Sequence, residues 1–446
     1  MRSGGVVLGL ALAAAAGCRE LAGIRDLGPD GGVRVQLEVV VEGDAPGHVR
    51  VTPRTGGAVL ECPPDCRLRL PEGAEVGLEG LPRNGEGSLF TGWTTENCGG
   101  SSATCNLTLA RDQQVGARFI RANHNVIFVT SDPVPASLGG LGPYDAHCNA
   151  MATLGGINGL DGRDFFAWLS TPEVAVVDRL QGARGFVRPD GRPVSNDLTD
   201  PAAGIIYPIT TDERGVVIGR DEIMTATTGT GTPSRGCAGF TSSDQNDSAE
   251  AGLFGAGAAG WTTGAHAGCA LSHSIYCFSR GKTTPLAPLP RAGKLVFLSS
   301  AGFRPAEGAG SADALCQAER PTSHAAASFR ALLATSTAPA TRWLVPGDSY
   351  LRVDGAQVGT GLALSKGDLE TGIWQTASGD YVSDVRLVAT GAVGEGGPGD
   401  GAGETCGDWS SSVGDHRTGV AASSRRWWGW EKSRCDGLFS VYCVQQ

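Results

Sequence analysis

The chain has 446 residues and a formal net charge of −10, so it is acidic and long enough for about two to four domains. The charge and the lack of a basic run argue against nucleic acid as a partner, because phosphate binding requires clustered cations. Apolar residues make up 41% of the chain, charged residues only 18%, and 68 residues are glycine, which favours loop-rich, extracellular-type domains over disorder.

The thirteen cysteines divide into one single residue and three groups of four. The groups are Cys62, Cys66, Cys98 and Cys105; Cys148, Cys237, Cys269 and Cys277; and Cys316, Cys406, Cys435 and Cys443. An even set in each region predicts a disulfide framework, which persists only in an oxidising compartment.

The N-terminus is predicted to direct export. Arg2 is followed by an apolar, small-residue run over residues 5–16, which is too short for a membrane span and is typical of a signal peptide covering residues 1–17. The sequence Ala15-Ala16-Gly17-Cys18 resembles a bacterial lipoprotein cleavage box. The resemblance implies that Cys18 is lipidated, which also accounts for the unpaired cysteine. The alternative is an ordinary signal peptide with an incidental cysteine.

The lipoprotein resemblance also gives an expected location. Arg19, rather than aspartate, follows the cysteine, and by family analogy this favours the outer membrane. We therefore expect an exported, lipid-anchored protein at the outer membrane or cell surface of a Gram-negative bacterium. Residues 18–32 lack apolar periodicity and are interpreted as a tether.

Residues 33–120 are predicted to form an all-β module. Apolar residues alternate over 33–41 and 48–52, and short apolar stretches at 76–78, 89–90, 107–109 and 115–119 are separated by glycine and proline.

This region resembles the internalin-type bacterial B-repeat. The resemblance is carried by four cysteines, Phe90-Thr91-Gly92-Trp93, Cys98-Gly99-Gly100 and Val115–Phe119. It implies a small β-rich module, immunoglobulin- or ubiquitin-like, without a catalytic role. Two alternatives stay open: the four cysteines could bind zinc, and Trp93 could stack on a sugar instead of packing in the core.

Residues 123–280 and 292–446 are two copies of one unit. Trp261, Cys269 and Ser274-Ile275-Tyr276-Cys277 recur as Trp427, Cys435 and Ser440-Val441-Tyr442-Cys443 with the same spacing. In each copy we predict an opening strand (126–131 and 295–300), a helix around the first cysteine, and a second helical stretch at 165–169 and 329–333. A hairpin is predicted at 186–191 and 350–355. The proline-rich residues 281–291 are interpreted as a stiff linker.

The order of these elements resembles a C-type-lectin-like domain. More specifically it resembles bacterial endostatin-like domains of the collagen non-collagenous type. Phe128–Ser131, Gly139-Gly140-Leu141, Arg179-Leu180 and Ile275–Phe278 carry the resemblance, and the second copy keeps less of it. The resemblance implies two α+β domains with nested disulfides: Cys148–Cys277 around Cys237–Cys269, and Cys316–Cys443 around Cys406–Cys435. Spacing alone leaves three pairings open in each domain.

No cofactor, metal site or catalytic residue is predicted. The calcium-binding tripeptides of sugar-binding C-type lectins do not occur, and the histidines lack metal-ligand spacing. A Gly-x-Ser-x-Gly elbow, a His-Glu-x-x-His motif and a phosphate-binding loop are also missing.

The most conspicuous candidate for ligand binding is an aromatic cluster in the second copy. Trp428 and Trp430 lie beside Arg425 and Arg426, a combination typical of binding hot spots. The alternative is that Trp427, which aligns with Trp261, packs in the core and the other tryptophans cover it.

We therefore expect a non-enzymatic surface protein that binds a polysaccharide or a protein. A structural display or spacer role is the alternative, and a hydrolase comes third. The sequence identifies no specific ligand.

Overall fold

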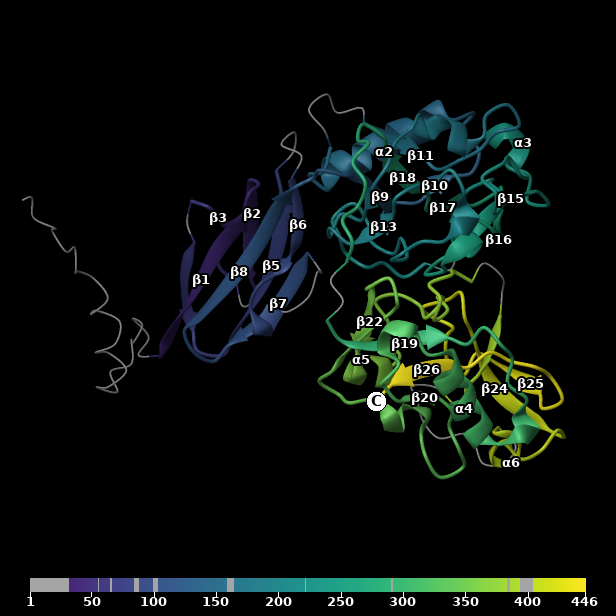
Figure 1. Cartoon of the computed structure of the whole chain (residues 1–446). Coiled ribbons are helices and arrows are strands. Elements are labelled where there is room, and N and C mark those ends of the chain that lie inside the picture. The colour runs from purple at the N-terminus through teal and green to yellow at the C-terminus, as the bar shows by residue number, and fades with distance from the viewer. Residues whose placement is uncertain are drawn as a thin grey trace, which may run out of the picture.

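The computed structural model describes residues 32–54, 56–64, 66–83, 88–98, 103–158, 164–220, 222–289, 292–382, 386–393 and 404–446. Within these ranges the chain is β-rich: its strands form several separate sheets, and the five α-helices have at most 13 residues (Figure 1). The β-rich, multidomain character of the predicted fold class is thereby confirmed. The signal peptide and Cys18 lie outside the described residues.

The first region contains two four-stranded sheets. One has the order β4 (Arg67–Pro71), β1 (Arg34–Gly43), β8 (Gln113–Arg121), β6 (Ser88–Trp93). The other has the order β3 (Leu60–Cys62), β2 (Gly47–Pro53), β5 (Ala74–Pro82), β7 (Thr104–Leu109). Strand β1 pairs with β8 in parallel and with β4 antiparallel. The predicted strands of this region are all found.

Alternation of side chains builds the core of this region. In β5 every second residue is buried, as the period of two of a strand requires. The buried residues form one cluster, in which Phe90 lies 5.0 Å from Trp93 and 5.3 Å from Phe119 between ring centroids. Trp93 is therefore a core residue, which favours the packing alternative over sugar stacking.

The first copy is built on a five-stranded sheet. Its order is β11 (Phe165–Ala167), β18 (Tyr276–Ser279), β9 (Asn125–Val129), β12 (Phe186–Val187), β13 (Pro193–Ser195). Helix α2 (Gly142–Leu154) packs on β11, and η2 (Val176–Leu180) follows. A smaller sheet has the order β14 (Glu222–Met224), β15 (Ser248–Leu253), β16 (Gly264–Gly268).

The second copy repeats both of these sheets strand for strand, whereas the short pair β10 (Val134–Pro135) and β17 (Ser272–His273) of the first copy is represented there by the single bridge between Phe303 and Phe439. Its large sheet has the order β20 (Phe329–Ala331), β26 (Tyr442–Gln445), β19 (Lys294–Leu298), β21 (Ser349–Leu351), β22 (Gln357–Thr360). Its small sheet has the order β23 (Leu387–Ala389), β24 (Asp415–Val420), β25 (Glu431–Arg434), and α4 (Ala309–Glu319) takes the place of α2. The predicted duplication is therefore visible in the fold.

The predicted second helix is wrong in both copies. Residues 165–167 and 329–331 are strands β11 and β20, which pair antiparallel with the terminal strands β18 and β26. A carboxylate of the preceding helix fixes each strand. Asp145 accepts the Ala167 backbone N–H at 2.9 Å, and Asp313 accepts that of Ala331 at 2.9 Å. This tertiary contact overrides the helical pattern.

Six disulfides tie these elements together. Cys62 pairs with Cys66 and Cys98 with Cys105, so the zinc alternative for this group is not supported. In the copies the bonds are nested as the resemblance implies: Cys148–Cys277 around Cys237–Cys269, and Cys316–Cys443 around Cys406–Cys435. Each outer bond joins the first helix to the terminal strand.

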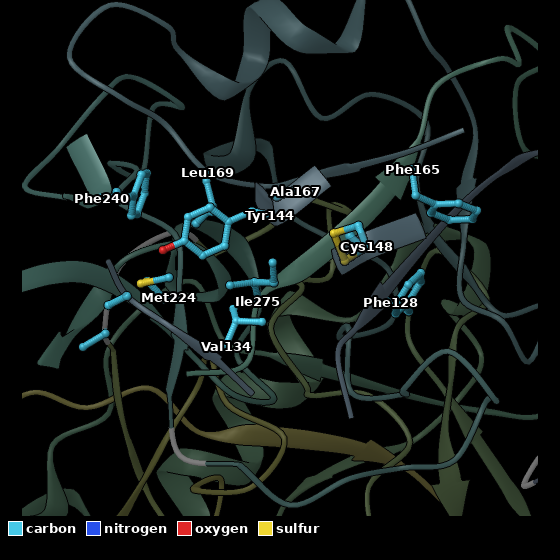
Figure 2. Packing of buried hydrophobic residues seen from close by; sticks show 14 of the residues in the cluster. Phe128, Val134, Tyr144, Cys148, Phe165, Ala167, Leu169, Met224, Phe240 and Ile275 are labelled. Atoms are coloured by element: carbon cyan, nitrogen blue, oxygen red, sulfur yellow. A yellow bond between two sulfur atoms is a disulfide. The ribbon is translucent and has the colours of Figure 1, made fainter. Parts of the chain in front are cut away.

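The outer disulfide of the first copy lies within an apolar cluster. Figure 2 shows Cys148 near Phe128 and Phe165 at one end of the cluster and Tyr144 near Phe240 at the other. The Tyr144 and Phe240 rings lie 5.1 Å apart in an edge-on arrangement. The Tyr144 hydroxyl donates to the Pro135 carbonyl at 2.8 Å, which satisfies the polar end of a buried ring.

The two copies lie against each other (Figure 1) and are joined by backbone hydrogen bonds. Gly257 N–H donates to the Ala422 carbonyl at 2.9 Å, and Ser424 N–H donates to the Gly255 carbonyl at 3.0 Å. The linker is also attached, because Leu286 N–H donates to the Asn196 side chain at 2.6 Å. The second copy is therefore held against the first by hydrogen bonds and is not attached through the linker alone.

Candidate functional site

The candidate segment of the second copy connects β24 to β25. Its backbone is held at both ends, since Val420 N–H donates to the Arg426 carbonyl at 2.7 Å and Trp430 N–H donates to the Thr418 carbonyl at 2.7 Å. Gly419 permits this closure. A Cβ at Gly419 would lie 1.7 Å from the Trp427 carbonyl oxygen, so a larger residue cannot fit. The segment is therefore a defined turn.

Two of the three tryptophans in this segment are buried. Trp427 packs against Tyr442 in the core, at 5.7 Å between ring centroids. Trp428 is 8% exposed and stacks on Trp427 at 4.1 Å with an interplanar angle of 12°. For these two residues the packing alternative describes the arrangement, and Trp428 does not offer its ring to a surface ligand.

Trp430 differs from its neighbours because its side chain is 47% exposed. The Arg426 guanidinium lies 4.0 Å from the Trp430 ring centroid, within the range of a cation–π interaction. The predicted pair of exposed tryptophan and arginine is thus Trp430 with Arg426. Together they present an aromatic surface and a positive charge on one side of the turn.

The remaining cations of the segment have other contacts. Arg425 lies over the Phe254 ring of the first copy at 4.7 Å, so this residue joins the two copies. Lys432 forms a close ion pair with Glu404, which also pairs with Arg417 at 2.8 Å. In the part of the chain that the structure describes, Arg425 and Arg426 form no ion pair, so their charges are not neutralised by a carboxylate.

The first copy lacks this arrangement. With Trp261 aligned on Trp427, Gly260 takes the place of Arg426 and Gly264 that of Trp430. The backbone is nevertheless similar, because a Cβ at Gly252 would lie 1.8 Å from the Trp261 carbonyl oxygen, as at Gly419. The aromatic–cation pair is therefore an addition of the second copy to a shared turn.

The inner disulfides begin on unusual turns. Cys406, Gly407, Asp408 and Trp409 have φ of 52°, 60°, 55° and 66°, and Cys237 to Phe240 repeat this left-handed turn. Non-glycine residues rarely adopt this conformation, and consecutive ones more rarely still. Trp409 N–H donates to the Thr405 carbonyl at 2.7 Å, closing the turn.

A buried histidine beside this turn was missed by the sequence analysis. His416 is fully buried on β24, between the rings of Trp409 (5.5 Å) and Phe439 (4.4 Å). Burial lowers the pKa of His416 to about 4, although the backbone of its cross-strand partner Ser433 and the charge of Asp415 favour protonation. The imidazole is therefore neutral at pH 7.

The surroundings of His416 contain two sulfur atoms. Ligand atoms of His416, Cys406 and Cys435 all lie within 4.8 Å of one another, the one such group of histidine, cysteine or acidic residues among the described residues. The sulfurs are joined to each other in a disulfide. The histidine spacing in the sequence gave no signal for this group, because the strand pairing brings it together.

The sequence matches no protein-family model and no curated protein at a significant level. In the described ranges, no helix is long and apolar enough to cross a membrane.

Proposed function

We propose that the protein is a lipid-anchored, exported surface protein whose second copy binds a polysaccharide or protein ligand without catalysis. The lipoprotein box at Cys18 and the resemblance to B-repeat and C-type-lectin-like, endostatin-like domains motivate the location and the class. The observation that carries the binding proposal is the exposed Trp430 with Arg426 stacked on it.

The chemistry of this pair suits surface recognition. An indole offers a large, rigid apolar face at low entropic cost, and the guanidinium adds directional hydrogen bonds to carboxylate, sulfate or phosphate oxygens. The Trp427–Trp428 stack beneath the turn holds it in place, so little ordering is required when a ligand binds. A rigid turn with an exposed Trp–Arg pair is suited to anchor a sugar face or a peptide side chain.

The proposal is tested with the full chain on a glycan array and in pull-downs from cell-surface extracts, with the variant Trp430→Ala measured beside wild type. A control is Leu362→Ala in α5 (Gly361–Ser365). Leu362 is also an exposed apolar residue, and α5 lies on the opposite side of the second copy from β25 (Figure 1). Trp430→Ala should weaken binding by at least about 2 kcal/mol, whereas Leu362→Ala should leave it unchanged.

Three results would count against the proposal. Equal loss of binding in both variants would indicate a general effect on folding. Retained binding in Trp430→Ala would place the ligand elsewhere. Absence of any ligand in both assays would favour the spacer role.

A further inference from the structure

His416 is a polar side chain in an apolar enclosure. Although the Ser433 backbone lies close enough to favour protonation of the ring, neither ring nitrogen has a hydrogen-bond partner of ordinary geometry in the part of the chain that the structure describes. An unsatisfied buried polar group destabilises the folded state, so such a residue requires an explanation. The aromatic rings of Trp409 and Phe439 pack around it but offer no lone pair to its N–H and no donor to its free nitrogen.

The sulfurs of Cys406 and Cys435 lie close to this imidazole, since the ligand atoms of the three residues are all within 4.8 Å of one another. As a disulfide they are poor hydrogen-bond partners. As two thiolates beside a neutral imidazole they are ligands that Zn²⁺ prefers, and three protein ligands leave one coordination position for a further small ligand. Two thiolates also cancel the charge of Zn²⁺, and a neutral complex suits an apolar enclosure better than a charged one.

We propose that reduction of the Cys406–Cys435 disulfide converts the second copy into a zinc-binding site formed by Cys406, Cys435 and His416. A dithiol reductant supplies two electrons and two protons to the S–S bond and itself becomes a disulfide. The two resulting thiols lose their protons when Zn²⁺ binds, and a ring nitrogen of His416 supplies the third ligand. While the disulfide is intact, its sulfurs cannot serve as thiolate ligands.

The first copy shows which residue distinguishes this site. Its inner disulfide Cys237–Cys269 begins on the same left-handed turn, and the bridge partner across from that turn is Ala249, where the second copy has His416. The first copy therefore supplies two sulfurs without an imidazole. This makes it an internal reference for what a reduced disulfide alone can bind.

The site is tested in the full chain under native conditions. The protein is treated with graded dithiothreitol, opened disulfides are identified by alkylation and mass spectrometry, and after removal of the reductant Zn²⁺ is titrated against a chromophoric chelator. We expect one tightly bound zinc per chain, appearing together with opening of Cys406–Cys435. Co²⁺ in place of zinc should give the visible and thiolate charge-transfer bands of a tetrahedral sulfur site.

Three variants separate the contributions. His416→Ala and His416→Asn should weaken zinc binding at least tenfold, and Asn serves as the variant that keeps a polar group if Ala fails to fold. Cys406→Ser/Cys435→Ser retains Cys237–Cys269 and should bind no zinc after reduction.

Equal affinity in wild type and both His416 variants overturns the proposal, as does zinc binding by the double serine variant. The proposal is also wrong if Cys406–Cys435 opens only when circular dichroism shows the fold to be lost, because then no folded site exists.

Discussion

The Trp374 indole N–H donates a hydrogen bond of 3.0 Å to the backbone carbonyl of Ile205, although the two residues belong to different copies of the duplicated unit. Trp374 is fully buried, and it packs in the same apolar cluster as Trp168 and Trp261 of the first copy. Gly257 makes room for it, because a Cβ there would lie 2.6 Å from the indole ring. The second copy thus completes part of the core of the first.

A buried arginine strengthens this contact. The fully buried Arg352 donates to the Ile206 carbonyl of the first copy at 2.9 Å and to Asp354 of its own copy at 2.6 Å. Burial alone raises the pKa of Asp354, but the charge and hydrogen bonds of Arg352 outweigh it and hold the pKa below its ordinary value. Arg352 and Asp354 therefore both stay charged where the two copies meet.

Removal of the Trp374 indole should weaken the packing of the two copies against each other. Trp374→Ala leaves a cavity in the shared cluster, and we expect a loss of about 3–5 kcal/mol in the free energy of unfolding. Hydrogen exchange should accelerate at residues 205–209 of the first copy as well as around position 374. Leu362→Ala, which removes an exposed side chain, is the control. Exchange changes confined to the second copy would show that the copies are energetically independent.

The disulfides should differ in their contributions to stability. Cys148–Cys277 encloses a sequence separation of 129, whereas Cys62–Cys66 encloses only 4. In the chain-entropy description, replacing both cysteines by alanine should cost about 5 kcal/mol for the first bond and about 2 kcal/mol for the second. Chemical denaturation of the two double variants measures this. A larger loss from the short-loop variant would contradict the entropic explanation.

Much of this fold is accessible from the sequence because its elements have local signals. Alternation predicts the strands of residues 33–120, and the repeated Trp–Cys–Cys spacing predicts the duplication. The strands at 165–167 and 329–331 were not predicted, because Asp145 and Asp313 fix them from a distance in the chain. No local signal reveals the left-handed turn at Cys406, whose non-glycine residues do not favour it.

The candidate ligand-binding site was also predictable in part, because local sequence signals point to it. Arg426 and Trp430 are close in sequence, and the turn between β24 and β25 brings them together. Proximity in sequence could not show that Trp428 turns inward to stack on Trp427. The His416 group depends on pairing between strands, which a histidine count does not reveal.

Asp212 should make stability depend on pH. Burial and the neighbouring Glu213 raise its pKa to about 6, although its Oδ1 accepts the N–H groups of Arg214 and Val216. Because the folded pKa lies above the unfolded value, this group favours the folded state below about pH 4, and that contribution is lost as pH rises through 6. The full effect is about 3 kcal/mol.

The variant Asp212→Asn isolates this contribution, since the amide oxygen can accept the same hydrogen bonds without charge. Denaturation at pH 4 to 7 should show the free energy of unfolding of wild type falling relative to the variant as pH rises. Asp244→Asn, in an exposed turn where Asp244 accepts the Asn246 N–H, should follow wild type. Parallel curves for wild type and Asp212→Asn would show that Asp212 ionises without penalty.

Substitutions at Trp428 and Trp430 should distinguish a tryptophan that stabilises the fold from one that is available to contact a ligand. Trp428→Ala removes the ring stacked on Trp427 and opens a cavity beside the core, so we expect a loss of about 3 kcal/mol in the free energy of unfolding. Trp430→Ala removes a half-exposed ring and should change stability by less than about 1 kcal/mol, chiefly through the lost contact with Arg426.

Both variants are compared by denaturant titration, with Trp427→Ala as the reference for a fully buried indole. If Trp430→Ala destabilises the protein as much as Trp428→Ala, the exposed ring is structural. Trp430 would then be no better a candidate for ligand contact than its buried neighbours.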